Sequence, residues 1–265
     1  MYMKLKGLKV GIATTVLLMC SGITHHYTYA AADQYEVKVY VDSDKVVKDN
    51  RHIKHDVLEA LGSEDKDEDF NVAFLDNKER SNYKDKVTYR LRKSEKDKKY
   101  ALQYKKRYPI VNNQVDQAIK QAKADGYNGD EFEVEYGENS QTLSVTKEAK
   151  ADTDLKGLEM PNAAQSLTLF KSFATSPYKN KLAAITQPTL IGPVHFERHK
   201  GTINNHDIKI ENWDVKNQNI VEISTKVKTE AEAKKAQKDI VNKLNDLGIH
   251  EQRDQLKTNL IFDNY

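Results

Sequence analysis

Arg90 and Arg92 are the residues in this sequence whose type and spacing point most clearly to chemistry. The segment 87–107 is typical of two strands joined by a polar turn, and side chains two residues apart on a strand share one face. Arg90 and Arg92 therefore project together on the face opposite Tyr89, and Lys105 of the second strand can join them. Because such a cationic face is costly to bury alone, it needs water or an anion, and phosphate is the natural partner.

Other predicted strands supply carboxylates and further cations. Carboxylates are hard ligands for Mg²⁺ or Mn²⁺, whereas guanidinium and ammonium groups neutralise phosphate oxygens. In a closed or nearly closed antiparallel barrel, alternate residues of each strand face the lumen, so these groups would meet in a charged tunnel. The charged residues on predicted strands include Glu36, Lys38, Arg90, Arg92, Lys105, Arg198, Lys200 and Glu222.

The elements that would position these residues can be read from periodicity. Alternation of polar and apolar residues predicts strands at 34–40, 70–76, 131–136, 142–147, 190–203, 206–213 and 219–227. Helical spacing predicts helices near 53–61, 115–122 and 229–247, and two helical pieces at 162–186 that cover one end of the sheet. Thr229 and Glu232 form a capping box that begins the last helix. The expected fold class is α+β, an antiparallel β-barrel with flanking helices.

The predicted domain organisation is simple. Residues 1–30 are a leader, 31–250 form one domain that includes the helical insertion at 162–186, and 251–265 form a C-terminal tail without predicted structure. With five prolines and eleven glycines in 265 residues, the chain shows no flexible linker that would separate two domains.

The leader has the pattern of a secretory signal peptide. Three lysines precede an apolar run at 10–20 that contains no acid, and Thr28 and Ala30 are small residues placed for cleavage after Ala30. A retained membrane anchor is one alternative. Lipidation of Cys20 is another, although Met19 is a poor match to the small residue that precedes a lipidated cysteine. We therefore expect a secreted or extracytoplasmic protein, with attachment to the cell surface as a variant of that prediction.

Composition excludes several classes of function. Charged residues are 31% of the chain and hydrophobic residues 38%, which fits a soluble globular domain. Without its leader the chain has 39 Lys and Arg against 40 acids, or −1, so no overall basic field would attract nucleic acid. Cys20 is the only cysteine, which excludes disulfides and thiol chemistry in the exported domain. No phosphate loop, dinucleotide fingerprint, zincin motif or Gly-x-Ser-x-Gly elbow occurs.

Between Gln34 and Gly248 the order of segments resembles the CYTH superfamily of triphosphate tunnel metalloenzymes, which includes class IV adenylyl cyclases, thiamine triphosphatases and inorganic triphosphatases. That family begins with a Glu-x-Glu-x-Lys strand, continues with an Arg-x-Arg strand and a lysine strand, and ends with arginine, acidic and Glu-x-Glu strands. The corresponding residues here are Gln34, Glu36 and Lys38; Arg90 and Arg92; Lys105; and Arg198, Glu211, Glu222 and Ser224.

The resemblance implies a role for each of these residues. The triphosphate-binding residues would be Lys38, Arg90, Arg92, Lys105, Arg198 and Lys200. Glu36, Glu211 and Glu222 would hold Mg²⁺ or Mn²⁺, and Glu36 and Glu222 would position the metal that assists attack by water. Gln34 and Ser224 replace two carboxylates of the family pattern, which should weaken the metal side.

The resemblance thus implies an exported protein that binds a triphosphate or polyphosphate. The sequence leaves open whether it also hydrolyses this ligand as a metal-dependent triphosphatase. The alternative is a noncatalytic extracytoplasmic module for an anionic ligand or a cell-surface polymer. Neither nucleic acid nor a further transmembrane segment is expected, and the oligomeric state is not predicted.

Three other features have alternative interpretations. A surface patch for an acidic polymer would consist of Lys93, Lys96, Lys98, Lys99, Lys105, Lys106 and Arg107. Glu131, Glu133 and Glu135 could be ligands, but the polar outer face of a strand is the simpler interpretation. His52 and His55 could contribute to a metal site, but the sequence shows no third ligand, and a surface position is the simpler interpretation.

Overall fold

A computed structural model describes residues 32–265 except 50, 65–66, 130 and 217, so the predicted leader lies outside the described residues. The strands are β1 (Gln34–Val41), β2 (Glu68–Asn77), β3 (Val87–Ser94), β4 (Lys99–Pro109), β5 (Glu131–Tyr136), β6 (Gln141–Asp152), β7 (Pro188–Ile203), β8 (His206–Val215), β9 (Gln218–Val227) and β10 (His250–Glu251). The helices are α1 (Ser43–Val46), α2 (His55–Ala60), α3 (Ser81–Lys84), α4 (Val115–Ala124), α5 (Ala163–Phe173), α6 (Tyr178–Ala183), α7 (Glu230–Asp246) and α8 (Lys257–Asn264).

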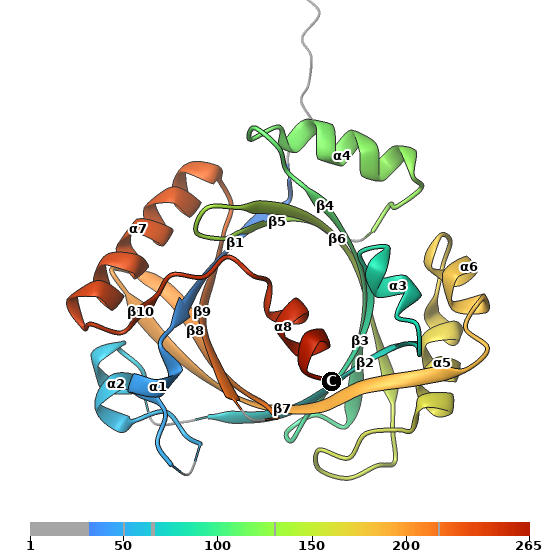
Figure 1. Ribbon diagram of the computed structural model, residues 1–265, viewed down its shortest axis with the longest axis horizontal. Coiled ribbons are helices and arrows are strands. Elements are labelled where there is room, and N and C mark those ends of the chain that lie inside the picture. The colour runs from blue at the N-terminus through green and yellow to red at the C-terminus, as the bar shows by residue number, and fades with distance from the viewer. Residues whose placement is uncertain (1–31, 50, 65–66, 130, 217) are drawn as a thin grey trace, which may run out of the picture.

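Nine of these strands close into a barrel (Figure 1). Their order around the ring is β1-β5-β6-β4-β3-β2-β7-β8-β9, and β9 pairs with β1 to complete it. The neighbouring strands are antiparallel, apart from the parallel pair of β1 and β5. The predicted α+β barrel with flanking helices is therefore confirmed, and the parallel pair is a detail that alternation alone did not predict.

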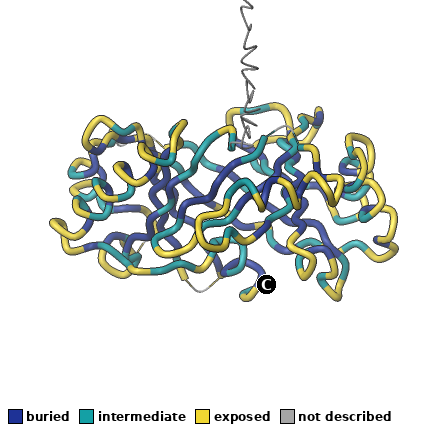
Figure 2. Tube along the Cα trace, turned by 90° about the horizontal axis from the view of Figure 1, so that it is seen from above, coloured by how far each residue is buried: buried dark blue, intermediate teal, exposed yellow. Residues whose placement is uncertain are grey.

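The outer wall of the barrel packs against helices. Outward side chains of β3 and β4 donate hydrogen bonds to backbone carbonyls of α5 and α6, from Tyr104 Oη to Phe170 at 2.7 Å and from Tyr89 Oη to Tyr178 at 3.2 Å. The helical segment predicted at 162–186 thus covers the side of the barrel, not an end of the sheet (Figure 1). In Figure 2 the buried positions run through the middle of the molecule and the exposed positions lie around its outside.

The C-terminal tail, for which the sequence predicted no structure, enters the barrel. Figure 1 shows α8 inside the ring of strands. Its residues Leu260, Ile261 and Phe262 join a second hydrophobic core made of inward side chains of β2, β7, β8 and neighbouring strands. Phe262 also stacks on Tyr83 of α3 with ring centroids 4.0 Å apart. One part of the lumen is therefore apolar and filled by α8, and the remaining part is charged.

The last long helix, α7, begins as predicted. Thr229 Oγ1 accepts from the backbone N–H of Glu232 at 3.2 Å, and a carboxylate oxygen of Glu232 accepts from the backbone N–H of Thr229 at 2.9 Å. This reciprocal capping box satisfies helix donors that would otherwise lack partners. None of the described helices has both the length and the apolar character needed to cross a bilayer.

Candidate anion-binding tunnel

The charged part of the lumen is a cavity of about 240 Å³. Period-two alternation aims side chains from eight strands into it, and the tail before α8 borders it. Of the nine predicted site residues, the eight that line this cavity are Glu36, Lys38, Arg90, Arg92, Lys105, Arg198, Glu211 and Glu222. Lys200 is the exception, because it is exposed and lines a separate hollow that also includes Arg198 and Lys209.

The cations of β3 and β7 crowd one side of the tunnel. Cζ of Arg92 and Cζ of Arg198 lie 5.4 and 4.5 Å from the ring centroid of Phe70, which β2 places between their strands. Burial lowers the pKa of Arg90, and burial together with the guanidiniums of Arg90 and Arg198 lowers the pKa of Arg92 to about 10. Within the described chain, buried Nε of Arg90 has no hydrogen-bond partner. A bound anion would relieve this crowding of positive charge.

The opposite side of the tunnel carries carboxylates from β1 and β5. Parallel pairing sets Glu36 opposite Glu135, and carboxylate oxygens of Glu36, Glu133 and Glu135 lie within 4.8 Å of one another. The interpretation of Glu131, Glu133 and Glu135 as an outer face is wrong, because all three line the cavity and two of them are only 2% exposed. The polar face of an alternating strand can equally be the lumen of a closed barrel.

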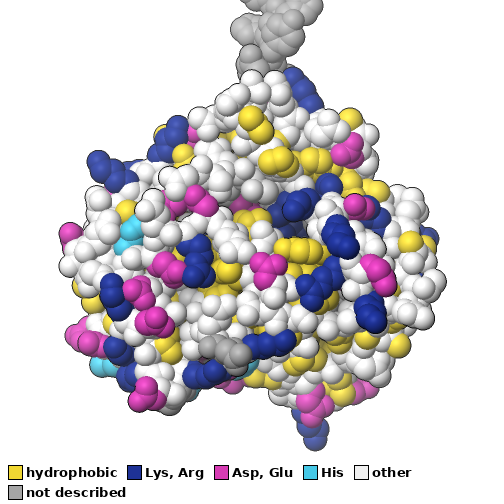
Figure 3. Space-filling model, in the orientation of Figure 1, with side chains coloured by type: hydrophobic (Ala, Val, Ile, Leu, Met, Phe, Trp, Pro, Cys, Tyr) yellow, Lys and Arg dark blue, Asp and Glu magenta, His cyan; other side chains and the backbone are white. Residues whose placement is uncertain are grey.

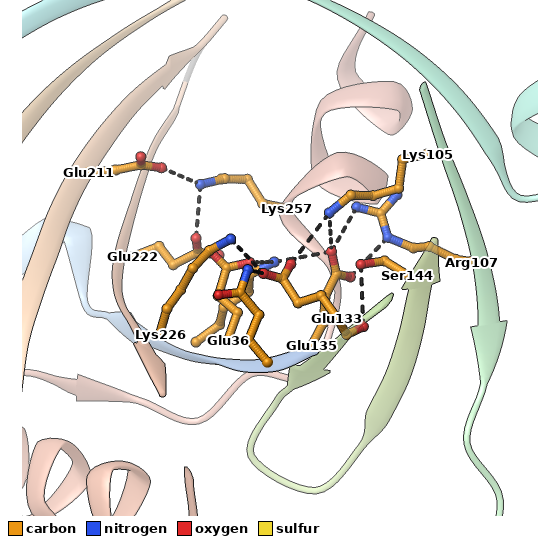
Figure 4. Close-up of polar contacts among 12 residues, drawn as sticks. Glu36, Lys105, Arg107, Glu133, Glu135, Ser144, Glu211, Glu222, Lys226 and Lys257 are labelled. Atoms are coloured by element: carbon orange, nitrogen blue, oxygen red, sulfur yellow. Dashed lines mark hydrogen bonds and ion pairs between the residues drawn. The ribbon is translucent and has the colours of Figure 1, made fainter. Parts of the chain in front are cut away.

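Fixed cations neutralise these carboxylates (Figure 4). Glu135 accepts from Lys105 Nζ at 2.8 Å and from Arg107 Nε at 2.9 Å. Lys38 Nζ lies 2.9 Å from Glu36 and 3.3 Å from Glu135. Burial raises the pKa of Glu36, but Lys38 and Lys105 outweigh it and the pKa falls to about 2. Burial likewise raises the pKa of Glu135, and its three cations hold that pKa well below the usual range. Both glutamates are therefore ionised at neutral pH.

Glu133 has its own partners. Lys226 Nζ lies 2.5 Å from one of its oxygens, and the side-chain amide of Gln34 donates to the same oxygen at 3.0 Å. Gln34 stands where the CYTH pattern has its first glutamate. At this position, a neutral amide therefore donates a hydrogen bond to Glu133. Burial and the nearby charge of Glu36 raise the pKa of Glu133.

Lys257, the first residue of α8, binds the carboxylates of β8 and β9. Its Nζ lies 2.7 Å from Glu211 Oε2 and 2.9 Å from Glu222 Oε1, residues that face each other across the strand pair (Figure 4). Arg198 donates to the other oxygen of Glu211 at 2.7 Å. Burial raises the pKa of Glu211, but Lys257 and Arg198 together hold it well below its usual range.

The tunnel carboxylates are the right type of ligand for a divalent metal, but cations of the protein already balance their charge. Carboxylate oxygens are the ligands that Mg²⁺ and Mn²⁺ prefer. However, the predicted ligands fall into two groups: Glu36 clusters with the β5 carboxylates, whereas Glu211 and Glu222 share Lys257. Each of these carboxylates already contacts a lysine or arginine. A metal ion in the tunnel must therefore compete with a resident ammonium group.

Several lining residues were not predicted as site residues. They include Arg107, Lys209, Lys226, Lys257, Glu131, Glu133 and Glu135. Alternation from Lys105 to Arg107 and from Glu222 to Lys226 was a signal that could have identified two of them. The single surface patch predicted for an acidic polymer is wrong, because Lys105 and Arg107 face the tunnel and Lys93 is 2% exposed.

The exposed side of this region is mixed in charge. In Figure 3, basic and acidic side chains surround the apolar surface at the centre of the view, where Figure 1 places α8. Among the lining residues, Arg253, Asp254, Gln255 and Leu256 come from the segment that leads into α8, and Lys257 and Thr258 are the first two residues of α8. The tail therefore forms part of the tunnel wall.

No protein-family model and no curated protein matches this chain. Among solved structures, HpAC1 from Hippeastrum, whose structure report gives it a dominant triphosphatase activity, is 12% identical with a TM-score of 0.56, over 86% of this chain and 94% of HpAC1. An adenylate cyclase candidate from Bacillus halodurans is 12% identical with a TM-score of 0.49, over 87% of this chain and 98% of its own. At such identities the likeness is one of fold. The chain therefore has the CYTH-like tunnel fold that its sequence predicted.

Proposed function

We propose that this protein is exported and binds a triphosphate or polyphosphate in the basic part of its tunnel. The observation that carries the proposal is the convergence of Arg90, Arg92 and Arg198 on one cavity, with Arg92 and Arg198 beside the buried ring of Phe70 and the pKa of Arg92 lowered to about 10. Guanidinium groups donate in the paired geometry that phosphate oxygens accept. A cavity of about 240 Å³ suits a small ligand. The triphosphatase activity reported for HpAC1 agrees with this ligand class.

Export remains a proposal that rests on the leader. Three lysines, an apolar run and small residues before a cleavage position at Ala30 support it. The absence of cysteine after residue 20 is compatible with an extracytoplasmic domain that needs no disulfide. Such a location favours polyphosphate over nucleoside triphosphates, which should be scarce outside the cell.

Hydrolysis would be a second step on the same site. Bound Mg²⁺ or Mn²⁺ would polarise a phosphoryl oxygen and activate water. Glu36 and Glu222 are the carboxylates proposed to hold this ion, together with Glu211. Lys38, Lys105 and the arginines would neutralise charge on the phosphate oxygens.

A noncatalytic binding module is the second candidate, and Lys257 is the observation that favours it. An ammonium group that contacts both Glu211 and Glu222 competes with a metal for the same oxygens. Gln34 and Ser224 also remove two negative charges that the family pattern places on the metal side. The same tunnel would then capture an anion without turnover.

One experiment separates the two candidates. Purified residues 31–265 are incubated with tripolyphosphate or ATP and with Mg²⁺ or Mn²⁺, and both binding and phosphate release are measured. Arg92→Gln should weaken binding and Glu36→Gln should abolish release. Arg51→Gln is the matched control, because Arg51 forms an ion pair with Asp214 outside the cavity lining.

Phosphate release that both tunnel variants lose supports the enzyme. Saturable binding that Arg92→Gln weakens, without release under any metal condition, supports the module. Binding that is the same in wild type, Arg92→Gln and Arg51→Gln contradicts both candidates, because the ligand would then not use the tunnel cations.

A further inference from the structure

The outer wall of β7 carries a group of charged side chains that the tunnel does not use. Since Phe196 and Arg198 face the lumen, alternation aims their neighbours outward, toward the α1 and α2 segment and the loop before β2. We call this group the outer cluster. Its members are His52, Asp67, Asp69, His195, Glu197 and His199.

Three members of the outer cluster have the geometry of metal ligands. His52 Nδ1 lies 2.6 Å from Glu197 Oε2, and one ligand atom from each of His52, Asp67 and Glu197 lies within 4.8 Å of the other two. In a tetrahedral zinc site, donors at about 2.0–2.1 Å from the ion are about 3.3 Å apart. Shifts on the order of 1 Å at the two less buried side chains would bring the three donors to that spacing.

Glu197 is held in place by a shell of amides. Its Oε1 accepts from the backbone N–H of Ile53 and from the side-chain amide of Asn212, both at 3.1 Å. Asn219 in turn donates to the side-chain oxygen of Asn212 at 2.9 Å. These bonds fix one oxygen and leave the other directed at His52. Such outer contacts are what orients a metal-binding carboxylate.

The charge of the outer cluster is unlike that of the tunnel. Glu197 is 3% exposed, and its charged partners in the described chain are imidazoles, His52 at 2.6 Å and His199 at 3.7 Å. The nearby ammonium group of Lys96 bonds to the backbone carbonyl of Asp67. When the imidazoles are neutral, Asp67 and Glu197 contribute two negative charges, which a divalent cation would balance.

His199 is a further buried imidazole of the outer cluster, with its Nε2 3.7 Å from Glu197. It is 4% exposed, and among the described residues its Nδ1 has no hydrogen-bond partner. A buried polar nitrogen without a partner is uncommon in a folded protein. At least one imidazole nitrogen of the outer cluster, His199 Nδ1, is therefore not used by a hydrogen bond within the described residues.

We propose that His52, Asp67 and Glu197 bind a divalent transition-metal ion of the zinc type on the outer wall of the barrel. Mixed imidazole and carboxylate donors suit Zn²⁺, whereas Mg²⁺ prefers oxygen ligands alone. Three protein ligands leave the fourth tetrahedral position to water. The ion would tie the α1 and α2 segment and the loop before β2 to β7. This site is independent of the proposed tunnel function.

Titration of the purified, untagged protein with ZnCl₂ in a calorimeter tests the site. We expect one tight zinc ion per chain, and an affinity at least about tenfold lower in His52→Ala and in Asp67→Asn. The matched control is His206→Ala, which removes another imidazole paired with a carboxylate, Asp239 at 3.0 Å, that belongs to no ligand group among the described residues. Its zinc affinity should equal that of wild type.

Two further measurements locate the ion. Glu36→Gln alters the tunnel carboxylates and should leave zinc affinity unchanged, so a loss of binding there would assign the ion to the tunnel and overturn the proposal. Zinc should raise the midpoint of thermal unfolding in wild type but not in His52→Ala, whose side chain is 57% exposed and dispensable for packing. Equal zinc binding in wild type and His52→Ala, with both folded by circular dichroism, would also overturn it.

Discussion

The tunnel and the outer cluster both gather carboxylates from distant segments, yet they compensate them differently. In the tunnel, Glu135 contacts Lys38 and Arg107, and the surrounding carboxylates raise the pKa of each of these cations above its usual value. On the outer wall, the charged partners of Glu197 in the described chain are the imidazoles of His52 and His199, with no lysine or arginine among them. The tunnel carboxylates are therefore permanently neutralised, and those of the outer cluster are not.

This difference separates two kinds of ligand. Permanent cations, including Arg198 at Glu211, hold the tunnel carboxylates, and Arg90 and Arg92 are the guanidiniums proposed to bind the anion. Imidazoles can release their protons and accept a metal ion in exchange. One barrel wall would thus present the proposed anion site on its inner face and the proposed metal site on its outer face, because alternate residues of β7 point in opposite directions.

The largest expected effect is on anion binding in the double variant Arg90→Gln, Arg92→Gln. Hydrogen bonds to charged groups contribute about 1.5–3 kcal/mol each, so losing both guanidiniums should weaken tripolyphosphate binding on the order of 10²-fold to 10⁴-fold. Calorimetric titration measures this change. Arg51→Gln serves as the control with one outer guanidinium removed. An affinity within about threefold of wild type would mean that the tunnel arginines do not bind the ligand.

Lys257→Met should convert the tunnel from an anion site toward a metal site. Without the ammonium group, Glu211 and Glu222 lose their shared cation, which should lower the free energy of unfolding by about 3 kcal/mol. Denaturant unfolding measures that loss, and added Mn²⁺ should restore part of it because the freed carboxylates are oxygen ligands.

Lys238→Met is the matched control for that variant, since it removes an exposed lysine of α7. It should change neither stability nor Mn²⁺ binding. If Lys257→Met is as stable as wild type and gains no affinity for Mn²⁺, the lysine does not neutralise the two carboxylates as its position indicates.

The charged inner face of the barrel could be predicted from sequence because it follows from the spacing of residues close together in the chain. Arg90 and Arg92 share a face by period two alone, and the capping box of Thr229 and Glu232 spans three residues. The resemblance in segment order then gave the closed barrel. Eight of nine predicted site residues line one cavity for this reason.

What sequence reasoning missed depends on contacts between distant segments. Glu133 was assigned outward because alternation does not say which face of a strand meets the lumen. Lys257 reaches Glu211 and Glu222 only after the tail turns into the barrel. His52 showed no third ligand in the sequence because Glu197 lies 145 residues away.

Alkaline pH should weaken the anion site through Arg92. Its pKa is lowered to about 10, so it loses its proton before an ordinary arginine with a pKa of 12.5 would. Tripolyphosphate affinity should therefore be steady up to about pH 9 and fall about tenfold as the pH rises past 10. Titrations across this range measure it, with Arg92→Gln as the control that should lack the step. A step of equal size in that variant would assign it to another group.

The smallest expected effect is a loss of stability in the outer cluster, but not in the tunnel, as the pH rises from 6 to 9. A hydrogen bond to Glu197 raises the pKa of His52 above its usual 6.5, and the pKa of Glu197 is lowered to about 2. In metal-free protein the pair therefore stabilises the fold fully below pH 6.5, and this contribution is lost as the pH rises through the raised pKa of His52. Amide hydrogen exchange, corrected for its intrinsic pH dependence, should show weaker protection of the α1 and α2 segment at pH 9 than at pH 6.

Tunnel strands provide the internal reference for that measurement, because the ion pair of Arg107 and Glu135 is charged at both pH values. His52→Lys supplies a matched variant with a cation that does not titrate in this range. If protection of the α1 and α2 segment in wild type is the same at pH 6 and pH 9, or changes equally in His52→Lys, then the imidazole does not hold this segment. The tunnel and the outer cluster would then differ only in which face of β7 they occupy. Their different response to pH requires that a titrating imidazole holds the outer segment.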